Sequence, residues 1–255
     1  MTTTEKNKTA LILGGSSGLG LAAAKKLAQE GYDLCIIHRD RKSDLADFEQ
    51  EMNALRKIGR TVETYNKSAL KKETIGEVMS LIEDESIGVF IHSIAKGSLK
   101  DMSSGGLNKE DLDITLHAMG TSWWEWIQAL IKHNKLASEV RNIAFTSEGN
   151  TKVWPGYGAV SAAKATLEAL MRQMAVELAP KGVITNCIQA GTTQTTSFSM
   201  IPGSDKLAAM ATKRNPFNRL TTPEDIANAV YLLCLPEGKW INGTILKVDG
   251  GESLR

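Results

Sequence analysis

The sequence predicts an α/β fold: a single-domain, Rossmann-like, doubly wound parallel sheet flanked by helices. Short apolar runs alternate with longer amphipathic segments along most of the chain, and a glycine-rich turn follows the first apolar run. Repeated strand–helix–strand units place parallel strands in one sheet with helices on both faces. A chain of 255 residues with 42% hydrophobic composition can bury one large core, so we expect a single domain over residues 1–255.

Each expected element follows from its hydrophobic period. Continuous or alternating apolar runs indicate strands, and runs with apolar residues every three or four positions indicate helices. The strands are expected at 9–15, 33–39, 61–66, 88–95, 141–147, 183–191 and 244–250, and the helices at 19–31, 45–59, 73–86, 122–134, 157–180 and 223–234. Glycine, proline and acidic residues separate these segments, as at 180–182.

The charge balance excludes two classes of partner. With 30 basic and 29 acidic residues, the formal charge is +1, so no global field favours nucleic acid or an anionic membrane surface. The apolar run at 10–13 is far too short to span a bilayer, and no later window approaches about 20 apolar residues. We therefore expect a cytoplasmic protein that binds neither nucleic acid nor membrane.

The three cysteines, Cys35, Cys187 and Cys234, are scattered among apolar neighbours. An odd number at such spacing fits buried, small hydrophobic side chains better than a disulfide framework or a set of metal ligands. No metal site is expected.

The turn after the first apolar run carries three glycines, Gly14, Gly18 and Gly20, in the sequence GGSSGLG. Glycine permits a tight turn and a close backbone approach, and the N-terminus of the following helix attracts an anion. Because the turn joins a strand to a helix at the start of a βαβ pattern, we expect a dinucleotide phosphate site here. Its expected contacts are Gly14, Ser16, Ser17, Gly18, Leu19 and Gly20.

The end of the second expected strand bears on which dinucleotide is bound. NAD sites place an acidic residue there for the ribose hydroxyls, but this chain has His38 and Arg39 at the tip. A guanidinium can pair with a 2′-phosphate, so NADPH is favoured over NADH. Asp40, one position further on, keeps NADH open, and a solvated turn is the alternative reading of Arg39 and Arg41.

A tyrosine and a lysine stand seven positions apart in YGAVSAAK, Tyr157 to Lys164. On an α-helix this spacing differs by only about 20° around the axis but separates the residues by about 10 Å along it. The two side chains can therefore meet only across something between them, such as a nicotinamide ribose. In such a site the lysine holds the cofactor and the tyrosine faces the substrate.

Several segments together resemble the short-chain dehydrogenase/reductase superfamily over essentially the whole chain: the glycine turn, the helix with Tyr157 and Lys164, the strand and loop IQAGTTQT, and the terminal KVDGG. Ordinary members carry the tyrosine four residues before the lysine, where this chain has Val160. The Tyr-x6-Lys spacing is similar to that of the divergent enoyl-acyl carrier protein reductases. The run YGAVSAAKATLEALMRQMAVELAPK looks most like the NADPH-dependent Bacillus type.

Three further departures from the ordinary pattern agree with this resemblance. The chain reads HSIA at 92–95, His117 occupies the place of the ordinary structural asparagine, and Ala190 replaces a proline in IQAG. Two features differ from many enoyl reductases: Ser147 stands ten residues before the tyrosine, where they carry a second tyrosine, and the turn GGSSGLG is closer to ordinary members.

The resemblance implies an NAD(P)H-dependent enzyme that transfers hydride to the C=C bond of an enoyl thioester in fatty-acid or related biosynthesis. The implied catalytic residues are Tyr157, Lys164 and Ser147. The implied further cofactor contacts are Ser68, Ser93, Ile94, Ala95, Lys164, Thr193 and Thr195, and the substrate contacts are Gly97, Ser147 and Tyr157. The implied partners are an acyl thioester, on acyl carrier protein or coenzyme A, and further copies of this chain in a tetramer or dimer.

Residues 196–216 mix small polar residues with Phe198, Met200 and Met210. This composition indicates a mobile helical lid over an apolar acyl pocket, or else an ordinary connection packed on the domain. Lys213 and Arg214 could steer an acidic carrier protein, although a solvated charge pair is the simpler expectation.

Other side chains invite a structural interpretation. His92 and His117 are expected to be structural, because neither has a carboxylate partner at local spacing. Trp123, Trp124 and Trp126 cannot all face one core at helical spacing, so we expect at least one in a subunit interface.

Two other functions remain open at this stage. A carbonyl or 3-oxoacyl reductase would use Tyr157 as proton donor to a C=O oxygen. A dinucleotide-binding regulator would bind the cofactor tightly without turnover.

Overall fold

Seven strands form one sheet in the order β3-β2-β1-β4-β5-β6-β7. The structure is a computed structural model and describes residues 9–255. The strands are β1 (Thr9–Leu13), β2 (Asp33–His38), β3 (Val62–Asn66), β4 (Ile87–His92), β5 (Leu136–Ser147), β6 (Val183–Ala190) and β7 (Ile245–Val248). Every neighbouring pair is parallel, which confirms the predicted doubly wound sheet.

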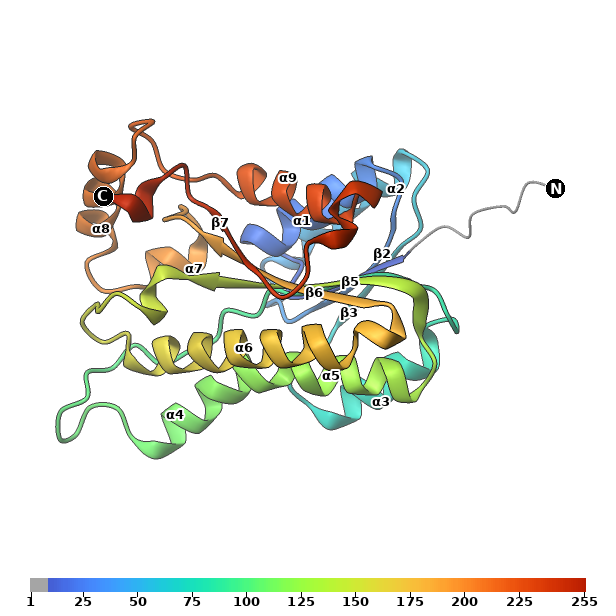
Figure 1. Ribbon diagram of the computed structural model, residues 1–255, viewed down its shortest axis with the longest axis horizontal. Helices are drawn as coiled ribbons and strands as arrows, with labels where there is room; N and C mark the ends of the chain where they lie inside the picture. Colours follow the sequence, from blue (N-terminus) through green and yellow to red (C-terminus); the bar gives the residue numbers. More distant parts are fainter. Residues whose placement is uncertain (1–8) are drawn as a thin grey trace.

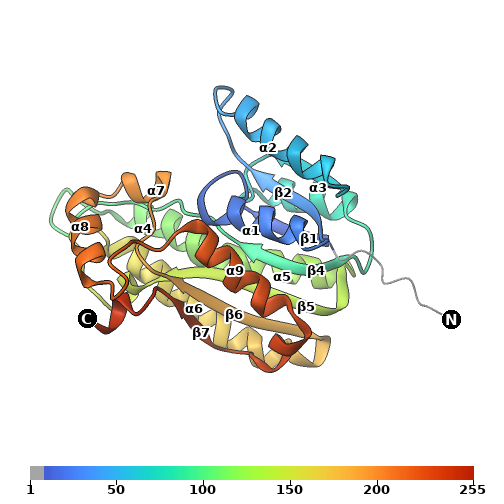
Figure 2. The ribbon, with the colours of Figure 1, turned by 90° about the horizontal axis from the view of Figure 1, so that it is seen from above.

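Helices cover both faces of the sheet (Figure 1). One face carries α1 (Gly18–Gln29), α2 (Leu45–Lys57) and α9 (Pro223–Cys234), and the other carries α3 (Lys72–Leu81), α5 (Ser122–Lys132) and α6 (Gly158–Glu177). Two short helices, α7 (Thr196–Ser199) and α8 (Ser204–Arg214), lie with the C-terminus at one end of the molecule (Figure 2). No helix within residues 9–255 has the length and apolar character needed to cross a membrane.

Strand β1 shows why the strands read as continuous apolar runs. Ala10 and Ile12 belong to the core under α1, α2 and α9, whereas Leu11 and Leu13 belong to the core under α3, α5 and α6. Successive side chains of a strand point to opposite faces. Because helices cover both faces, all four side chains are fully buried, and no polar residue interrupts the run.

The strand order reverses direction at β1, which lies between β2 and β4. The chain builds outward through β2 and β3, then returns to add β4 on the opposite side of β1. At such a switch point the loops beyond the carboxyl ends of the two strands diverge and leave a crevice. The crevice is therefore expected beyond Leu13 and His92.

The structure adds elements that the hydrophobic pattern did not predict. Helix α4 (Lys109–Leu116) is polar, and it begins at Asn108, whose side chain accepts a hydrogen bond from the Asp111 amide at 2.8 Å. Strand β5 begins at Leu136, five residues before its predicted start. Tyr157 precedes α6 as its N-cap instead of lying within the helix.

The tryptophans divide between core and surface. Trp123 and Trp126 are fully buried on one face of α5, and each indole N–H is satisfied, by the Asn142 side chain at 2.7 Å and the Ala69 carbonyl at 2.8 Å. Trp124 is 40% exposed. It is thus the one member of the group available to another subunit, and its place in an interface stays a prediction.

Candidate active site

A cavity of about 1340 Å³ lies beyond the carboxyl ends of the strands. It is lined by the glycine turn, the loops after β2, β4, β5 and β6, the start of α6, and helices α7 and α8. The lining includes all the residues predicted for cofactor and substrate contact except Gly20: Gly14, Ser16, Ser17, Gly18, Leu19, His38, Arg39, Ser68, Ser93, Ile94, Ala95, Gly97, Ser147, Tyr157, Lys164, Thr193 and Thr195. The fold thus gathers these residues around one cavity.

The glycine turn packs backbone against backbone. Gly14 has φ +80°, and a Cβ at this position would lie 2.5 Å from the carbonyl oxygen of Ser93. A Cβ on Gly20 would lie 2.2 Å from the carbonyl oxygen of Gly14. Gly20 therefore does not line the cavity, and its lack of a side chain serves the close approach of α1 to the turn.

The residues after β2 form a hydrogen-bonded group beside this turn. One carboxylate oxygen of Asp40 accepts a hydrogen bond from the Ser16 hydroxyl at 2.9 Å, and the other lies 2.8 Å from Nδ1 of the buried His38. Asn66 exchanges hydrogen bonds with the backbone N–H and carbonyl of Asp40. Arg39 is exposed, lines the cavity, and has no hydrogen-bond or ion-pair partner among residues 9–255.

Ser147 and Tyr157 meet at the end of β5. Their hydroxyl oxygens are 3.5 Å apart, which is the upper limit of a hydrogen bond. Burial raises the pKa of Tyr157 above its ordinary value, and the Ser147 hydroxyl opposes this in part. The phenol is therefore protonated at neutral pH and can act as a hydrogen-bond donor.

Lys164 lies on α6 and is buried beside the same cavity. Its Nζ donates a hydrogen bond to the Phe145 carbonyl at 2.7 Å. Burial lowers the pKa of Lys164 to about 8. One turn further along, the buried Glu168 carboxylate accepts hydrogen bonds from Thr146 and Asn150, which ties the loop after β5 to α6.

His92 ends β4 and lines the cavity. Its Nε2 lies 2.9 Å from the Ser122 hydroxyl, whereas Nδ1 is buried without a partner among the described residues. Burial, followed by the nearby Lys164 charge, lowers the pKa of His92 to about 3. The ring is therefore neutral at physiological pH.

His117 departs from the sequence-based expectation. It begins a π-turn (His117–Thr121), and its Nε2 lies 3.0 Å from Oε2 of Glu125. On a regular α-helix, residues eight apart point about 80° away from each other around the axis. A π-turn holds one extra residue, which reduces the accumulated rotation by about 100° and brings His117 and Glu125 onto the same face. His117 thus has a carboxylate partner that was not evident at local spacing, and its expected structural role is not contradicted. The pair does not line the cavity.

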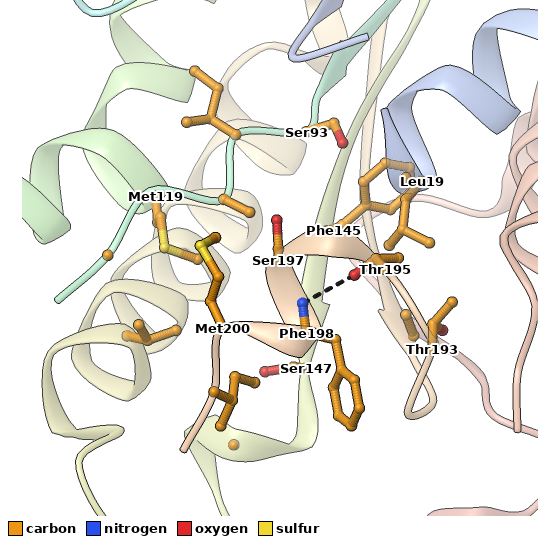
Figure 3. Close-up of a pocket in the computed structure, with 18 of the residues that line it drawn as sticks. Leu19, Ser93, Met119, Phe145, Ser147, Thr193, Thr195, Ser197, Phe198 and Met200 are labelled. Atoms are coloured by element: carbon orange, nitrogen blue, oxygen red, sulfur yellow. Dashed lines mark hydrogen bonds between the residues drawn. The ribbon is translucent and has the colours of Figure 1, made fainter. Parts of the chain in front are cut away.

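The threonines after β6 turn the chain into the lid segment. The Thr193 hydroxyl donates to the Gly191 carbonyl at 2.8 Å. The Thr195 hydroxyl caps α7 by accepting a hydrogen bond from the Phe198 amide at 3.1 Å (Figure 3). Because the Thr195 hydroxyl accepts in this bond, its proton remains available to a ligand in the cavity.

Apolar side chains line the end of the cavity that α7 and α8 cover. Figure 3 shows Phe198 and Met200 of the lid segment together with Met119 from the opposite wall. Val160 and Met210 line the cavity as well. The cavity therefore has a polar end at the glycine turn and an apolar end under the lid segment.

Arg214 also differs from its expected environment. It is neither a free surface charge nor one half of a solvated pair, because its guanidinium binds the carboxylates of Glu148 and Glu252. Lys213 remains exposed. Neither Glu148 nor Glu252 was identified from the sequence, since partners 66 and 38 residues away leave no periodic signal.

The cavity fits a nicotinamide dinucleotide. The cradle formed by Gly14 and Gly20 has no room for side chains, and it brings the turn and the start of α1 to the cavity, where a helix N-terminus favours phosphate. The exposed Arg39 supplies a further polar group without a partner among the described residues, along the wall.

Comparison with known proteins gives consistent matches over nearly the whole chain. The model of the enoyl-(acyl carrier protein) reductase family matches residues 14–253. A dehydrogenase/reductase SDR family member 4 from Sus scrofa is 25% identical over 258 residues, covering 98% of this chain and 88% of that protein. The BbsD subunit of a (2S)-[(R)-hydroxy(phenyl)methyl]succinyl-CoA dehydrogenase from Thauera aromatica is 27% identical, covering 98% of each chain.

Solved structures agree with the sequence matches. A short chain dehydrogenase from Burkholderia cenocepacia, in complex with NADP, superposes with a TM-score of 0.83 at 25% identity and covers 97% of this chain and 98% of that one. A short-chain type dehydrogenase/reductase from Mycobacterium ulcerans has a TM-score of 0.86 at 21% identity, covering 98% and 91% of the two chains. The second likeness concerns the fold alone.

Proposed function

The chain belongs to the short-chain dehydrogenase/reductase superfamily of oxidoreductases, and from this premise we propose that it reduces the C=C bond of an enoyl thioester with NADPH. The observation that carries the proposal is the position of the phenol. Among the described residues that line the cavity, Tyr157 is the only tyrosine, and it stands seven residues before Lys164.

The position four residues before Lys164 carries a valine that also borders the cavity. Val160 is 4% exposed and packs with Ala118 and Met119. A Cβ on Gly97 would lie 2.6 Å from Cγ2 of Val160, so the loop after β4 presses directly on this side chain. Valine has no group that can donate a hydrogen bond, so this position cannot supply the proton donor found there in ordinary members.

Tyr157 acts on the oxygen of the thioester. When bound, the reduced nicotinamide would supply a hydride to the β-carbon, negative charge would develop on the thioester oxygen, and a proton taken up from water at the α-carbon would complete the reduction. The protonated phenol of Tyr157 donates a hydrogen bond to that oxygen, an interaction that strengthens as the charge grows. Ser147, 3.5 Å from the phenol oxygen, orients the phenol or donates a second hydrogen bond.

Lys164 holds the nicotinamide ribose and supports Tyr157. An ammonium group has three donors, and only one is directed to the Phe145 carbonyl. The other two are available to ribose hydroxyls. The positive charge of the ammonium group also favours electron density on the tyrosine oxygen.

NADPH is the proposed cofactor because of the groups after β2. The Asp40 carboxylate is already engaged by Ser16 and His38, whereas the Arg39 guanidinium is unpaired within the described chain and borders the cavity. A free guanidinium suits a 2′-phosphate. The NADP complex of the Burkholderia cenocepacia relative is consistent with this choice.

The remaining parts of the proposal concern substrate and setting. The apolar end of the cavity suits an acyl chain, and the lid at 196–216 would cover it. We propose a thioester of acyl carrier protein or coenzyme A, a role in fatty-acid or related biosynthesis, a homo-oligomer and a cytoplasmic location. The last two rest on the family and on composition.

Reduction of a carbonyl group is the second candidate. Some relatives carry names of that class, among them the Thauera aromatica dehydrogenase subunit and an NADPH-dependent aldehyde reductase-like protein of Arabidopsis thaliana. In that reaction Tyr157 would donate its proton to the carbonyl oxygen. A cofactor-binding regulator without turnover would oxidise NADPH with neither class of acceptor.

The experiment that tests the role of Tyr157 is its replacement by phenylalanine. Tyr157→Phe should lower turnover of a crotonyl thioester by about a hundredfold to a thousandfold, the size of loss expected when one such donor is removed. The affinity for NADPH, measured by fluorescence titration, should change little. Tyr65→Phe is the matched control, because Tyr65 lies outside the cavity and binds Glu63. Full activity in Tyr157→Phe would show that Tyr157 is not the hydrogen-bond donor to the thioester oxygen.

A further inference from the structure

Three charged residues from distant parts of the chain meet beside the cavity. Arg214 ends α8, Glu148 follows Ser147 directly, and Glu252 begins the last turn of the chain (Glu252–Leu254). Nη2 of Arg214 donates hydrogen bonds to Oε1 of Glu148 and, at 2.6 Å, to Oε1 of Glu252. We call these three residues the Arg214 cluster.

The cluster connects the lid segment to both loops that carry site residues. Glu252 accepts hydrogen bonds from the Thr192 amide at 3.1 Å and from the Thr192 hydroxyl at 2.8 Å, and Thr192 adjoins Thr193 at the cavity wall. Glu148 adjoins Ser147 on the other side. Both views of the molecule place α8 and the C-terminus together at this end (Figures 1 and 2).

The burial of Glu252 makes the loss of its cation costly. The side chain of Glu252 is 2% exposed, and those of Arg214 and Glu148 are about one-quarter exposed. A buried carboxylate requires a partner charge or several hydrogen-bond donors. Lys152 pairs with Glu148 at 2.8 Å, but Arg214 is the only cation bound to Glu252 among the described residues.

Without Arg214, Glu252 would have no cation bound to it among the described residues, and Glu148 would keep only the partly exposed Lys152. Like charges at such short range repel, and the repulsion is large where water is scarce. The loop after β5 and the C-terminal turn would move apart, and α8 would lose its ion pairs to both, keeping the hydrogen bond from its C-cap residue Asn215 to the Asp249 carbonyl at 2.9 Å. Arg214 itself lines the cavity, so this movement would alter the cavity wall.

We propose that Arg214 is a positioning residue for the reaction. It attaches α8 over the apolar end of the cavity and, through Glu148, fixes Ser147 against Tyr157. Through Glu252 and Thr192, it also fixes the loop that carries Thr193. The catalytic part of this proposal rests on the proposed action of Tyr157, whereas the attachment of α8 does not.

The two carboxylates allow the two effects to be separated. Glu148→Gln removes the charge beside Ser147, so it should lower kcat and leave NADPH affinity near that of the wild type. Glu252→Gln weakens the hold on Thr192, so it should lower NADPH affinity. Arg214→Met, which keeps the apolar stem, should do both and should also raise KM for the acyl thioester.

The kinetic test is a double-mutant cycle. Arg214→Met should lower kcat by about tenfold or more, as expected for the loss of a charge-assisted hydrogen bond at a functional group. Combining it with Glu148→Gln should cost little more, because the two variants break the same contact. Arg214→Lys should restore part of kcat. Arg219→Met is the control, since Arg219 forms an exposed pair with Asp225 outside the cavity.

A second measurement needs no acceptor substrate. Amide hydrogen exchange of the α8 peptide should be at least about tenfold faster in Arg214→Met than in the wild type or in Arg219→Met, because local opening sets exchange of a peripheral helix. If the wild type reduced only ketones, the proposed C=C reduction would be wrong. Faster exchange in α8, together with a non-additive double-mutant cycle measured with a ketone substrate, would still support the positioning role of Arg214. Unchanged exchange in α8, or additive loss of kcat in the double variant, would overturn it.

Discussion

The polar end of the cavity, at the glycine turn, is shaped by backbone, whereas the apolar end under the lid segment is shaped by side chains. At the polar end, Gly14 and Gly20 bring main-chain atoms so close that a single Cβ has no space. At the apolar end, Phe198 and Met200 supply apolar surface, and Arg214 binds two carboxylates from distant parts of the chain. The glycine turn tolerates almost no added atom, whereas side chains at the apolar end can be exchanged with a smaller loss of stability.

The difference accounts for how the two ends relate to sequence. A backbone cradle is encoded by glycines within one short turn, next to the strand and helix that it joins. A side-chain network joins residues that are remote along the chain. The polar end is therefore the part suited to a cofactor that the superfamily shares, and we propose that the apolar end sets the substrate.

The largest effect on stability and cofactor binding is expected from a methyl group added at the glycine turn, at the polar end of the cavity. In Gly20→Ala the new Cβ would meet the Gly14 carbonyl at 2.2 Å, and neither partner is a flexible side chain. We expect a loss of about 3 kcal/mol in the free energy of unfolding, from overpacking, together with loss of NADPH binding. Urea denaturation and a cofactor titration measure the two effects. Wild-type stability in Gly20→Ala would contradict the description of this end.

The pH profile tests the point where the two ends meet, at Lys164. Its pKa of about 8 lies below the ordinary 10.5 because of burial, so the ammonium group is charged at neutral pH and loses its proton as pH rises through about 8. Turnover should therefore fall by roughly tenfold for each pH unit above this value. Equal turnover at pH values well above and below 8 would contradict a role for the charge.

The same group makes a prediction about stability with the opposite sign. Because the pKa of Lys164 is lower in the folded state, the unfolded state binds more protons between about pH 8 and the ordinary value of 10.5. The free energy of unfolding contributed by this group should rise with pH across that window. Lys164→Met should remove this rise, and urea denaturation at several pH values measures it.

A smaller effect is expected from the cofactor phosphate. Arg39→Ala should weaken NADPH binding by about tenfold and leave NADH binding nearly unchanged, because one charged contact to the 2′-phosphate is lost. Arg41→Ala is the matched control, since Arg41 is an exposed cation of the same turn that does not line the cavity. Equal losses for the two cofactors in Arg39→Ala would place Arg39 outside the phosphate site.

The smallest effect comes from a glycine with free space around it. Gly76 lies within α3, and a Cβ there meets no atom within 4 Å. Gly76→Ala should raise the free energy of unfolding by about 0.5–1 kcal/mol, because alanine is the better helix former. Comparison with Gly20→Ala by the same urea measurement shows whether the loss of stability comes from a steric clash of the new Cβ or from the loss of a glycine as such. A destabilised Gly76→Ala would show that the contrast is wrong.

Much of the fold could be predicted from sequence, because each buried strand carries its own apolar run. The turn at Gly14 and the spacing from Tyr157 to Lys164 each lie within a short stretch of sequence, so they could be recognised without the fold. Most of the contact residues predicted from them and from the resemblance line one cavity. Helix α4 was not predicted, since its sequence KEDLDITL is polar and its first turn depends on the Asn108 cap.

The missed contacts share a physical cause. Arg214 finds its partners only after α8, the loop after β5 and the C-terminal turn have been placed by the fold. The pairing of His117 with Glu125 depends on a π-turn, and hydrophobic periodicity does not report such a turn. Asp40 was noticed as a possible ribose contact, but its capture by Ser16 and His38 required the folded β2 tip.

The most direct test of the central claim is a comparison of two acceptors on the unmodified protein. Consumption of NADPH is followed with a crotonyl thioester, which offers a C=C bond, and with an acetoacetyl thioester, which offers a keto group. The position of Tyr157 and the burial of Val160 predict oxidation of NADPH with the crotonyl thioester and not with the acetoacetyl thioester. Oxidation with the acetoacetyl thioester alone would contradict the account and establish a carbonyl reductase.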